Sequence, residues 1–202
     1  MQQTTTSQAA AYFEQGIPVN EYIEQMHENR ELYRANIEQT RISDQDRATF
    51  GQAPLKILVL TEDWCTDSAQ MVPAVARLAR EVPGVELRLL RRDLHRDFAA
   101  GYPRADGYQA IPIFILLDGS GRELGTLIER PARATEEMAA ETRRFQREHP
   151  ELPGINRTFD HMPEETRAAV KEHSREWRQG RQDEFARYLL EDLAGIVSAR
   201  KQ

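Results

Sequence analysis

Cys65 is the only cysteine among the 202 residues, and its neighbours place it where thiol chemistry is favoured. It belongs to the sequence Trp64-Cys65-Thr66-Asp67-Ser68, between an apolar run that ends at Leu60 and an amphipathic stretch. At the first turn of a helix, free backbone N–H groups favour the thiolate, which is the nucleophilic form of the side chain. A lone cysteine excludes an intramolecular disulfide, so any exchange reaction must proceed through a mixed disulfide with another molecule.

The sequence around Cys65 lacks the second cysteine of a dithiol site and contains several acidic residues. Ser68 occupies the fourth position of a C-x-x-C spacing; its hydroxyl can donate a hydrogen bond to a thiolate but cannot resolve a mixed disulfide. Glu62, Asp63 and Asp67 flank the cysteine, and carboxylates disfavour a thiolate and repel an anionic small thiol. We expect Glu62 and Asp63 on the lip of the site, where they would select a basic protein partner. Asp67 is most simply a first-turn acid that complements the helix dipole.

The composition narrows the class of protein. Apolar residues make up 40% of the chain and charged residues 30%, which indicates a soluble globular protein. The formal charge of -6 gives no reason to expect nucleic acid or an anionic membrane as partner, and no apolar run approaches the ~18 residues that span a bilayer. The lone cysteine and the lack of a secretory pattern at residues 1–11 predict a cytoplasmic protein. The five histidines show no metal-ligand spacing, so we predict no metal and no cofactor.

The central part of the chain alternates strand and helix patterns. Continuous apolar runs and a Gly-rich turn predict four strands, at residues 55–61, 85–92, 113–117 and 123–129. Helical periodicity predicts a helix that follows Cys65 and ends near Pro83, and another that begins at Pro131. This order predicts a mixed sheet with one parallel crossover and a C-terminal antiparallel hairpin.

Both flanks are predicted to be helical. Residues 7–41 should form a short helix followed by a longer one, residues 43–54 a linker, and residues 163–199 a helical segment with a buried stripe that includes Phe185 and Leu189. The domain boundaries that we predict are a helical N-terminal extension at 1–49, a central domain at 50–150 and a helical C-terminal extension at 151–202. The extensions should pack on the central domain or on a second copy of the chain in a homodimer, because their aromatic stripes would otherwise be exposed.

The central segment, about residues 50–148, resembles the thioredoxin superfamily. Trp64-Cys65 matches the Trp-Cys pair that begins the family's redox site, and Pro73 matches the proline that kinks its active-site helix. Ile111-Pro112 and the strand and hairpin that follow resemble the family's cis-proline strand, which lies beside the reactive sulfur. The resemblance implies an α/β thioredoxin-like fold, with a four-stranded mixed sheet flanked by helices and helical N- and C-terminal extensions. It also implies a substrate lip formed by Trp64, Ile111 and Pro112, to which we add Asp67.

Three departures from the family pattern shape the function that the resemblance implies. Ser68 replaces the second cysteine, as in monothiol glutaredoxin-like relatives, Val59 replaces the buried aspartate six residues before the cysteine, and helices replace the usual first β-α-β portion. The implied activity is monothiol thiol–disulfide exchange through Cys65, supported by Ser68, on a protein disulfide, a mixed disulfide or a low-molecular-weight thiol. The alternative is a catalytically degenerate binding or adaptor module that keeps the fold. Val59, Ser68 and the surrounding acids favour this alternative.

Overall fold

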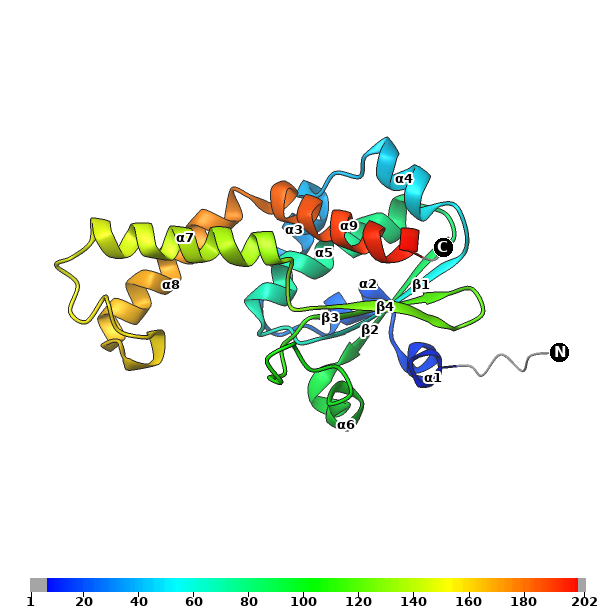
Figure 1. Cartoon of the computed structure of the whole chain (residues 1–202), viewed down its shortest axis with the longest axis horizontal. Helices are drawn as coiled ribbons and strands as arrows, with labels where there is room; N and C mark the ends of the chain where they lie inside the picture. The colour runs from blue at the N-terminus through cyan, green and yellow to red at the C-terminus, as the bar shows by residue number, and fades with distance from the viewer. Residues whose placement is uncertain (1–6, 200–202) are drawn as a thin grey trace.

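The computed structural model describes residues 7–199, so the outer ends of the two predicted extensions, residues 1–6 and 200–202, lie outside it. Four strands form one mixed sheet in the order β2-β1-β3-β4 (Figure 1). The strands are β1 (Leu55–Thr61), β2 (Val85–Arg91), β3 (Ile113–Asp118) and β4 (Glu123–Ile128). β1 pairs in parallel with β2 and antiparallel with β3, and β3 pairs antiparallel with β4. The predicted mixed sheet, with one parallel crossover and a C-terminal hairpin, is confirmed.

The two inner strands are apolar along their whole length because helices cover both faces of the sheet. Alternate residues of β1 belong to two different clusters: Ile57 and Val59 pack on one face, and Leu58 and Leu60 on the other. All four side chains are fully buried. The continuous apolar pattern is therefore that of a strand between two helical layers.

The larger core lies between the sheet and the helix that follows Cys65. This helix, α5 (Thr66–Glu81), packs against α3 (Arg30–Gln39) and α9 (Gln182–Ala199). Met71 of α5 and Leu189 of α9 are completely buried in this layer. The last helix of the chain thus packs on α5 of the same molecule.

A smaller layer covers the opposite face. It consists of α1 (Gln8–Gln15) and the short helix α6 (Arg96–Ala99), which both lie below the sheet in Figure 1. Phe13 and Phe98 bury their rings against the apolar side chains of that face. The single turn η1 (Arg92–Leu94) connects β2 to α6.

The N-terminal helices are shorter than the sequence predicts. The expected long helix is divided into α2 (Val19–Glu24) and α3, with Asn29 at a left-handed φ of 55° between them. At the break, the Asn29 side chain holds the loop that carries the cysteine, because its amide donates a hydrogen bond to the Asp63 carbonyl oxygen at 2.7 Å. The predicted linker at 43–54 is also wrong in part, since α4 (Asp44–Phe50) forms there.

Local chemistry explains why α4 forms within the predicted linker. Ser43 and Asp46 form a reciprocal capping box at the N-terminus of the helix, and Phe50 is buried at its end. A capping box satisfies two backbone donors that would otherwise be unpaired, so a helix of seven residues becomes favourable once its apolar side is buried.

The C-terminal helices form an arm, which consists of α7 (Ala132–Glu148) and α8 (Glu164–Gln179), and a last helix, α9, that packs on the body of the molecule. α7 and α8 pack on each other and project beyond the sheet, with the turn η2 (Phe159–His161) near their tip (Figure 1). Gly180 ends α8 and α9 turns back onto α5. The helical segment predicted at 163–199 therefore consists of two helices, and its first half does not lie on the sheet.

Candidate functional site

Cys65 occupies the N-cap of α5, between the end of β1 and the first helical turn. Its sulfur accepts the Ser68 N–H at 3.4 Å and lies 3.6 Å from the Ile111 carbonyl oxygen, to which the thiol can donate. The side chain is half-buried, so a partner sulfur can approach it. The Ile111–Pro112 peptide bond is cis, and Pro112 is buried directly before β3. The structure thus brings four of the predicted site residues together: Cys65, Ser68, Ile111 and Pro112.

The two contacts of the sulfur have different consequences for its protonation state. The Ser68 N–H can donate to a thiol or to a thiolate, whereas the contact with the Ile111 carbonyl uses the thiol hydrogen. Loss of the proton therefore keeps the helix N–H contact, which is the one that stabilises negative charge.

Ser68 supports the sulfur through its backbone and not through its side chain. The hydroxyl is fully buried and, among the described residues, has no hydrogen-bond partner. The hydroxyl-to-thiolate hydrogen bond that the sequence suggested is therefore absent from this geometry. The reason is positional: in the first turn of a helix the N–H of the third residue points at the N-cap side chain.

Glu62 and Asp63 do not form an exposed acidic lip, and this expectation is wrong. Both residues are buried, and Glu62 accepts the Asp93 N–H at 2.7 Å while Asp63 accepts the His27 N–H at 2.8 Å. Arg91 lies 3.7 Å from the Glu62 carboxylate and 3.8 Å from that of Asp63. Burial is also the main reason why the pKa of Glu62 is raised above its ordinary value. These acids hold the loop in place and are not available to select a partner.

Asp67 joins three parts of the chain. Its carboxylate forms ion pairs with Arg130, which follows β4, and with Arg178 near the end of α8. Each of the three side chains is no more than 17% exposed. Asp67 therefore lies in the first turn of α5 as predicted, but its charge is used internally and not on the substrate lip.

Trp64 lies on the exposed lip of the site. Its side chain is 47% exposed, and the guanidinium of Arg92 lies 6.0 Å from the centre of its ring. Leu94 and Tyr108 are also exposed, at 76% and 74%. Leu94 belongs to the turn after β2, beside the end of β1, and Tyr108 precedes Ile111 in the loop that leads to the cis bond. Large apolar or aromatic side chains are thus exposed at Trp64, in the turn after β2 and in the loop before the cis bond.

Val59 is completely buried in the apolar core below the site. No ionisable group therefore replaces the aspartate that the family pattern places at this position. Between residues 7 and 199, no group of three or more His, Cys, Asp or Glu side chains is arranged to hold a metal ion. Within the same range, no helix has the length and apolar character needed to cross a membrane.

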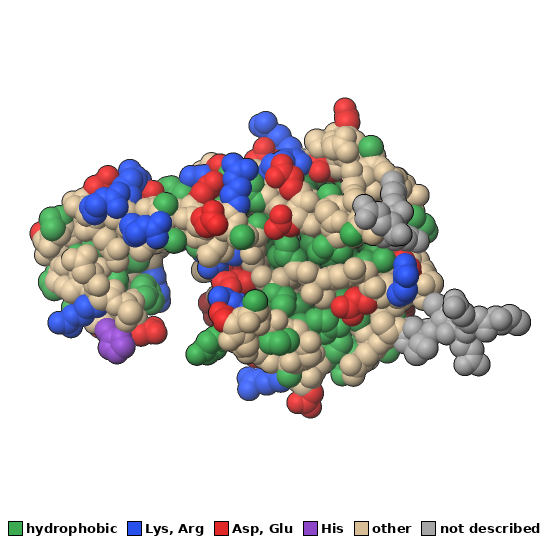
Figure 2. Space-filling model, viewed as in Figure 1, with side chains coloured by type: hydrophobic (Ala, Val, Ile, Leu, Met, Phe, Trp, Pro, Cys, Tyr) green, Lys and Arg blue, Asp and Glu red, His purple; other side chains and the backbone are tan. Residues whose placement is uncertain are grey.

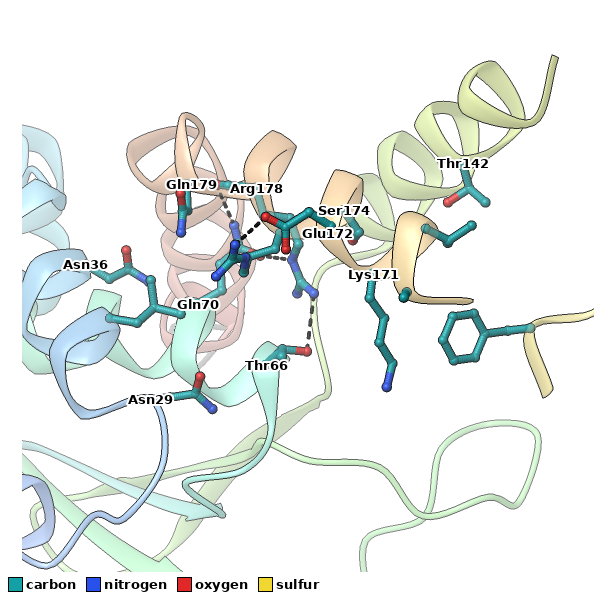
Figure 3. A pocket seen from close by; sticks show the side chains of 15 residues that line it. Asn29, Asn36, Thr66, Gln70, Thr142, Lys171, Glu172, Ser174, Arg178 and Gln179 are labelled. Atoms are coloured by element: carbon teal, nitrogen blue, oxygen red, sulfur yellow. Dashed lines mark hydrogen bonds and ion pairs between the residues drawn. The ribbon is translucent and has the colours of Figure 1, made fainter. Parts of the chain in front are cut away.

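A cavity of about 730 Å³ opens beside the first turns of α5, between that helix, α3 and the arm. Thr66 and Gln70 contribute one wall, and Arg178, Lys171 and Phe159 belong to the arm side. Figure 3 shows Arg178 reaching from α8 to both Thr66 and Gln70. Reasoning from the sequence missed this wall completely. Arg178 lies 111 residues from Asp67, and an arginine in a charged helix gives no signal of such a pairing.

Comparison with known families agrees with this geometry. The family model described as thioredoxin matches residues 16–143, which is more than half of the chain. This chain belongs to the thioredoxin family. The match includes Cys65, the cis bond and all four strands, and it ends within α7. No curated protein matches the chain significantly.

Solved structures extend the likeness to the helices outside the family match. A protein of unknown function from Pseudomonas aeruginosa is similar with a TM-score of 0.63 and 16% identity, over 96% of this chain and 99% of that one. An HIV epitope-scaffold is similar with a TM-score of 0.59 and 15% identity, again over 96% and 99% of the two chains. At these identities the likeness shows the fold alone. The terminal helices are therefore part of a fold that other chains share.

Proposed function

We propose that this protein performs thiol–disulfide exchange through Cys65, acting as a monothiol. The observation that supports the proposal best is the position of the sulfur: half-buried, at the N-cap of α5, and in contact with the Ser68 N–H. A helix N-terminus favours a thiolate, and partial exposure lets a second sulfur approach in line. The exposed Trp64 beside it provides an apolar contact for a protein substrate.

The reaction that this arrangement supports is a single exchange. The Cys65 thiolate attacks one sulfur of a partner disulfide, a new S–S bond forms, and the other partner sulfur leaves as a thiolate with the electron pair of the broken bond. Ser68 cannot attack the resulting mixed disulfide, and the buried Val59 supplies no acid or base. An external thiol must therefore attack the mixed disulfide and release Cys65. We place this chemistry in the cytoplasm, where small thiols are available for that step.

A second candidate function is a thioredoxin-fold adaptor that binds partners without exchange. The exposed apolar side chains of Trp64, Leu94 and Tyr108 favour it, because they would serve a docking surface equally well. The missing resolving group also fits an adaptor. The two functions differ in one measurable property, which is whether Cys65 forms a mixed disulfide with an oxidised protein.

The test is to incubate the protein with an oxidised model protein, quench with acid and measure the mixed disulfide by mass spectrometry. We expect an adduct in the wild type and none in Cys65→Ser. Ser68→Cys should then release the substrate and show disulfide reductase activity, because its thiol can resolve the adduct. If the wild type forms no adduct and Cys65 is alkylated no faster than a cysteine in an unstructured peptide, exchange is refuted and the adaptor function stands.

A further inference from the structure

The cavity beside α5 is a groove between two parts of the molecule. Leu32 and Asn36 of α3 and Thr66 of α5 lie on its body side, while Val170 and Lys171 of α8 lie on its arm side. In Figure 2 the surface is hollowed between the arm and the body. In Figure 3, Lys171 extends from α8 into this space, opposite Thr66 and Asn29. Thr66 directly follows Cys65 in the chain, so the groove begins one residue from the cysteine.

The groove lies on a different side of α5 from the cis bond. Cys65 contacts the Ile111 carbonyl, and neither residue lines the groove, whereas Thr66 and Gln70 of the same helix do. Residues four apart share a face of a helix, so these two side chains form one continuous wall. A molecule in this groove therefore leaves the lip formed by Trp64 and Pro112 free.

The charge available in the groove is positive. Arg178 is neutralised by Asp67, and Arg175 is paired with Glu172. Lys171 is different: within the described part of the chain no carboxylate lies within ion-pair distance of its ammonium group, which lies 5.7 Å from the centre of the Phe159 ring. An acidic side chain in the groove would provide the counter-ion that Lys171 lacks.

The rest of the lining combines apolar side chains with uncharged polar ones. Leu32, Ala168 and Val170 line it, and Phe159 is 39% exposed. A volume of about 730 Å³ lies well inside the range of roughly 300–1,000 Å³ that holds ligands of drug size, so a short peptide segment fits it. The lining therefore favours an occupant with one apolar and one acidic side chain.

We propose that this groove, defined by α3, the first turns of α5 and α8, binds a polypeptide segment of a partner protein. The segment carries an apolar residue against Phe159 and Val170 and an acidic residue against Lys171. The cysteine that exchanges with Cys65 lies outside the groove, in the stretch of the partner that continues past Thr66 to the lip. The inference rests on the proposed exchange function and names its substrate class. It also reverses the preference for basic partners that the acids around Cys65 suggest in the sequence, because those acids are buried or paired.

The test uses two synthetic peptides whose single cysteine is joined in a disulfide to thionitrobenzoate. The peptides share one apolar residue and differ only in whether their charged residues are glutamate or lysine. The Cys65 thiolate attacks the peptide sulfur, the S–S bond breaks, and thionitrobenzoate leaves as a coloured thiolate. The second-order rate of colour release is measured for each peptide, with the disulfide of thionitrobenzoate itself as a probe of intrinsic thiol reactivity.

We expect the acidic peptide to react about threefold faster than the basic one, the effect of one exposed ion pair. Lys171→Glu should invert the preference, and Phe159→Ala should slow both peptides without changing the rate with the small probe. Arg143→Glu is the matched control, because Arg143 is an exposed cation of α7 that does not line the groove. It should leave the preference unchanged.

Three other results would overturn the inference, and they differ in what they say about exchange. Equal rates for both peptides, unaffected by Lys171→Glu, would show that the groove does not bind the substrate, while exchange itself would stand. Insensitivity of both peptides to Phe159→Ala would likewise exclude the apolar contact. No colour above that of Cys65→Ser with any probe would refute the exchange function, and the inference with it.

Discussion

Replacing Asp67 with asparagine should loosen the arm from the body of the molecule. The substitution keeps the size of the side chain and removes the charge that faces both Arg130 and Arg178. Arg130 retains Glu129 at 2.6 Å. Arg178 is left with neutral partners only, the carbonyl oxygen of the Gln70 side chain at 2.6 Å and the Thr66 hydroxyl at 3.4 Å. The uncompensated charge therefore falls on α8.

The size of the effect follows from the burial of the three side chains. Asp67 and Arg130 are each 17% exposed and Arg178 is 13% exposed, so the pairs are intermediate between surface and buried ion pairs. Exposed pairs contribute about 0–1 kcal/mol, and breaking a buried pair costs about 3–5 kcal/mol. We expect Asp67→Asn to lower the free energy of unfolding by about 2 kcal/mol.

The assay combines urea unfolding with hydrogen exchange of the α8 amides. Unfolding gives the change in stability, and faster exchange in α8 locates the loosened element. The matched control is Asp44→Asn, which also removes one partner of an arginine pair, but at a carboxylate that is fully exposed. A double-mutant cycle with Arg178→Gln isolates the coupling between the two charges. The same midpoint and slope as the wild type, with unchanged exchange in α8, would refute the role assigned to Asp67.

Three further predictions follow from the structure. Leu189→Ala should lower the free energy of unfolding by about 2–5 kcal/mol, because the side chain is fully buried between α9 and α5. The control is Glu191→Ala, at an exposed position of the same helix. Equal urea midpoints for the two variants would contradict the packing. Burial alone would raise the pKa of Asp118, but hydrogen bonds from Ser120 and Arg122 lower it overall. The ionised carboxylate therefore stabilises the fold at pH values above the pKa that it has in the unfolded chain. This stabilisation is lost as the pH falls through the lower pKa of the folded state. Asp118→Asn should therefore cost about 2 kcal/mol at neutral pH and progressively less in acid, and a cost that does not vary with pH in urea titrations would contradict this. Ser68→Ala should leave the free energy of unfolding unchanged or higher, because it removes a buried hydroxyl that has no partner among the described residues. It should change the alkylation rate of Cys65 by less than about twofold, because the backbone N–H that contacts the sulfur remains. A large loss of stability or of alkylation rate would show that the hydroxyl has a partner.

The central fold and the position of the cysteine could be predicted from the sequence, since both depend on neighbouring residues. β1 ends at Thr61, four residues before Cys65, and the amphipathic pattern of α5 begins immediately after the cysteine. That order alone places the sulfur at a helix N-terminus. Strand length, turn chemistry and helical periodicity are local properties, which is why the four strands were predicted almost residue by residue.

Only the tertiary structure decided the electrostatics of the site and the groove beside it. Glu62, Asp63 and Asp67 look alike in the sequence, yet two are buried against backbone N–H groups and the third is paired with arginines 63 and 111 residues away. The break before Asn29 likewise depends on a carbonyl 34 positions further along the chain. A charge is neutralised by whatever group lies within a few ångströms of it, and a single sequence does not contain those distances. The fold therefore buries or pairs the three acids around Cys65, and a sequence that looks acidic at this point gives no free acidic group beside the sulfur among the described residues.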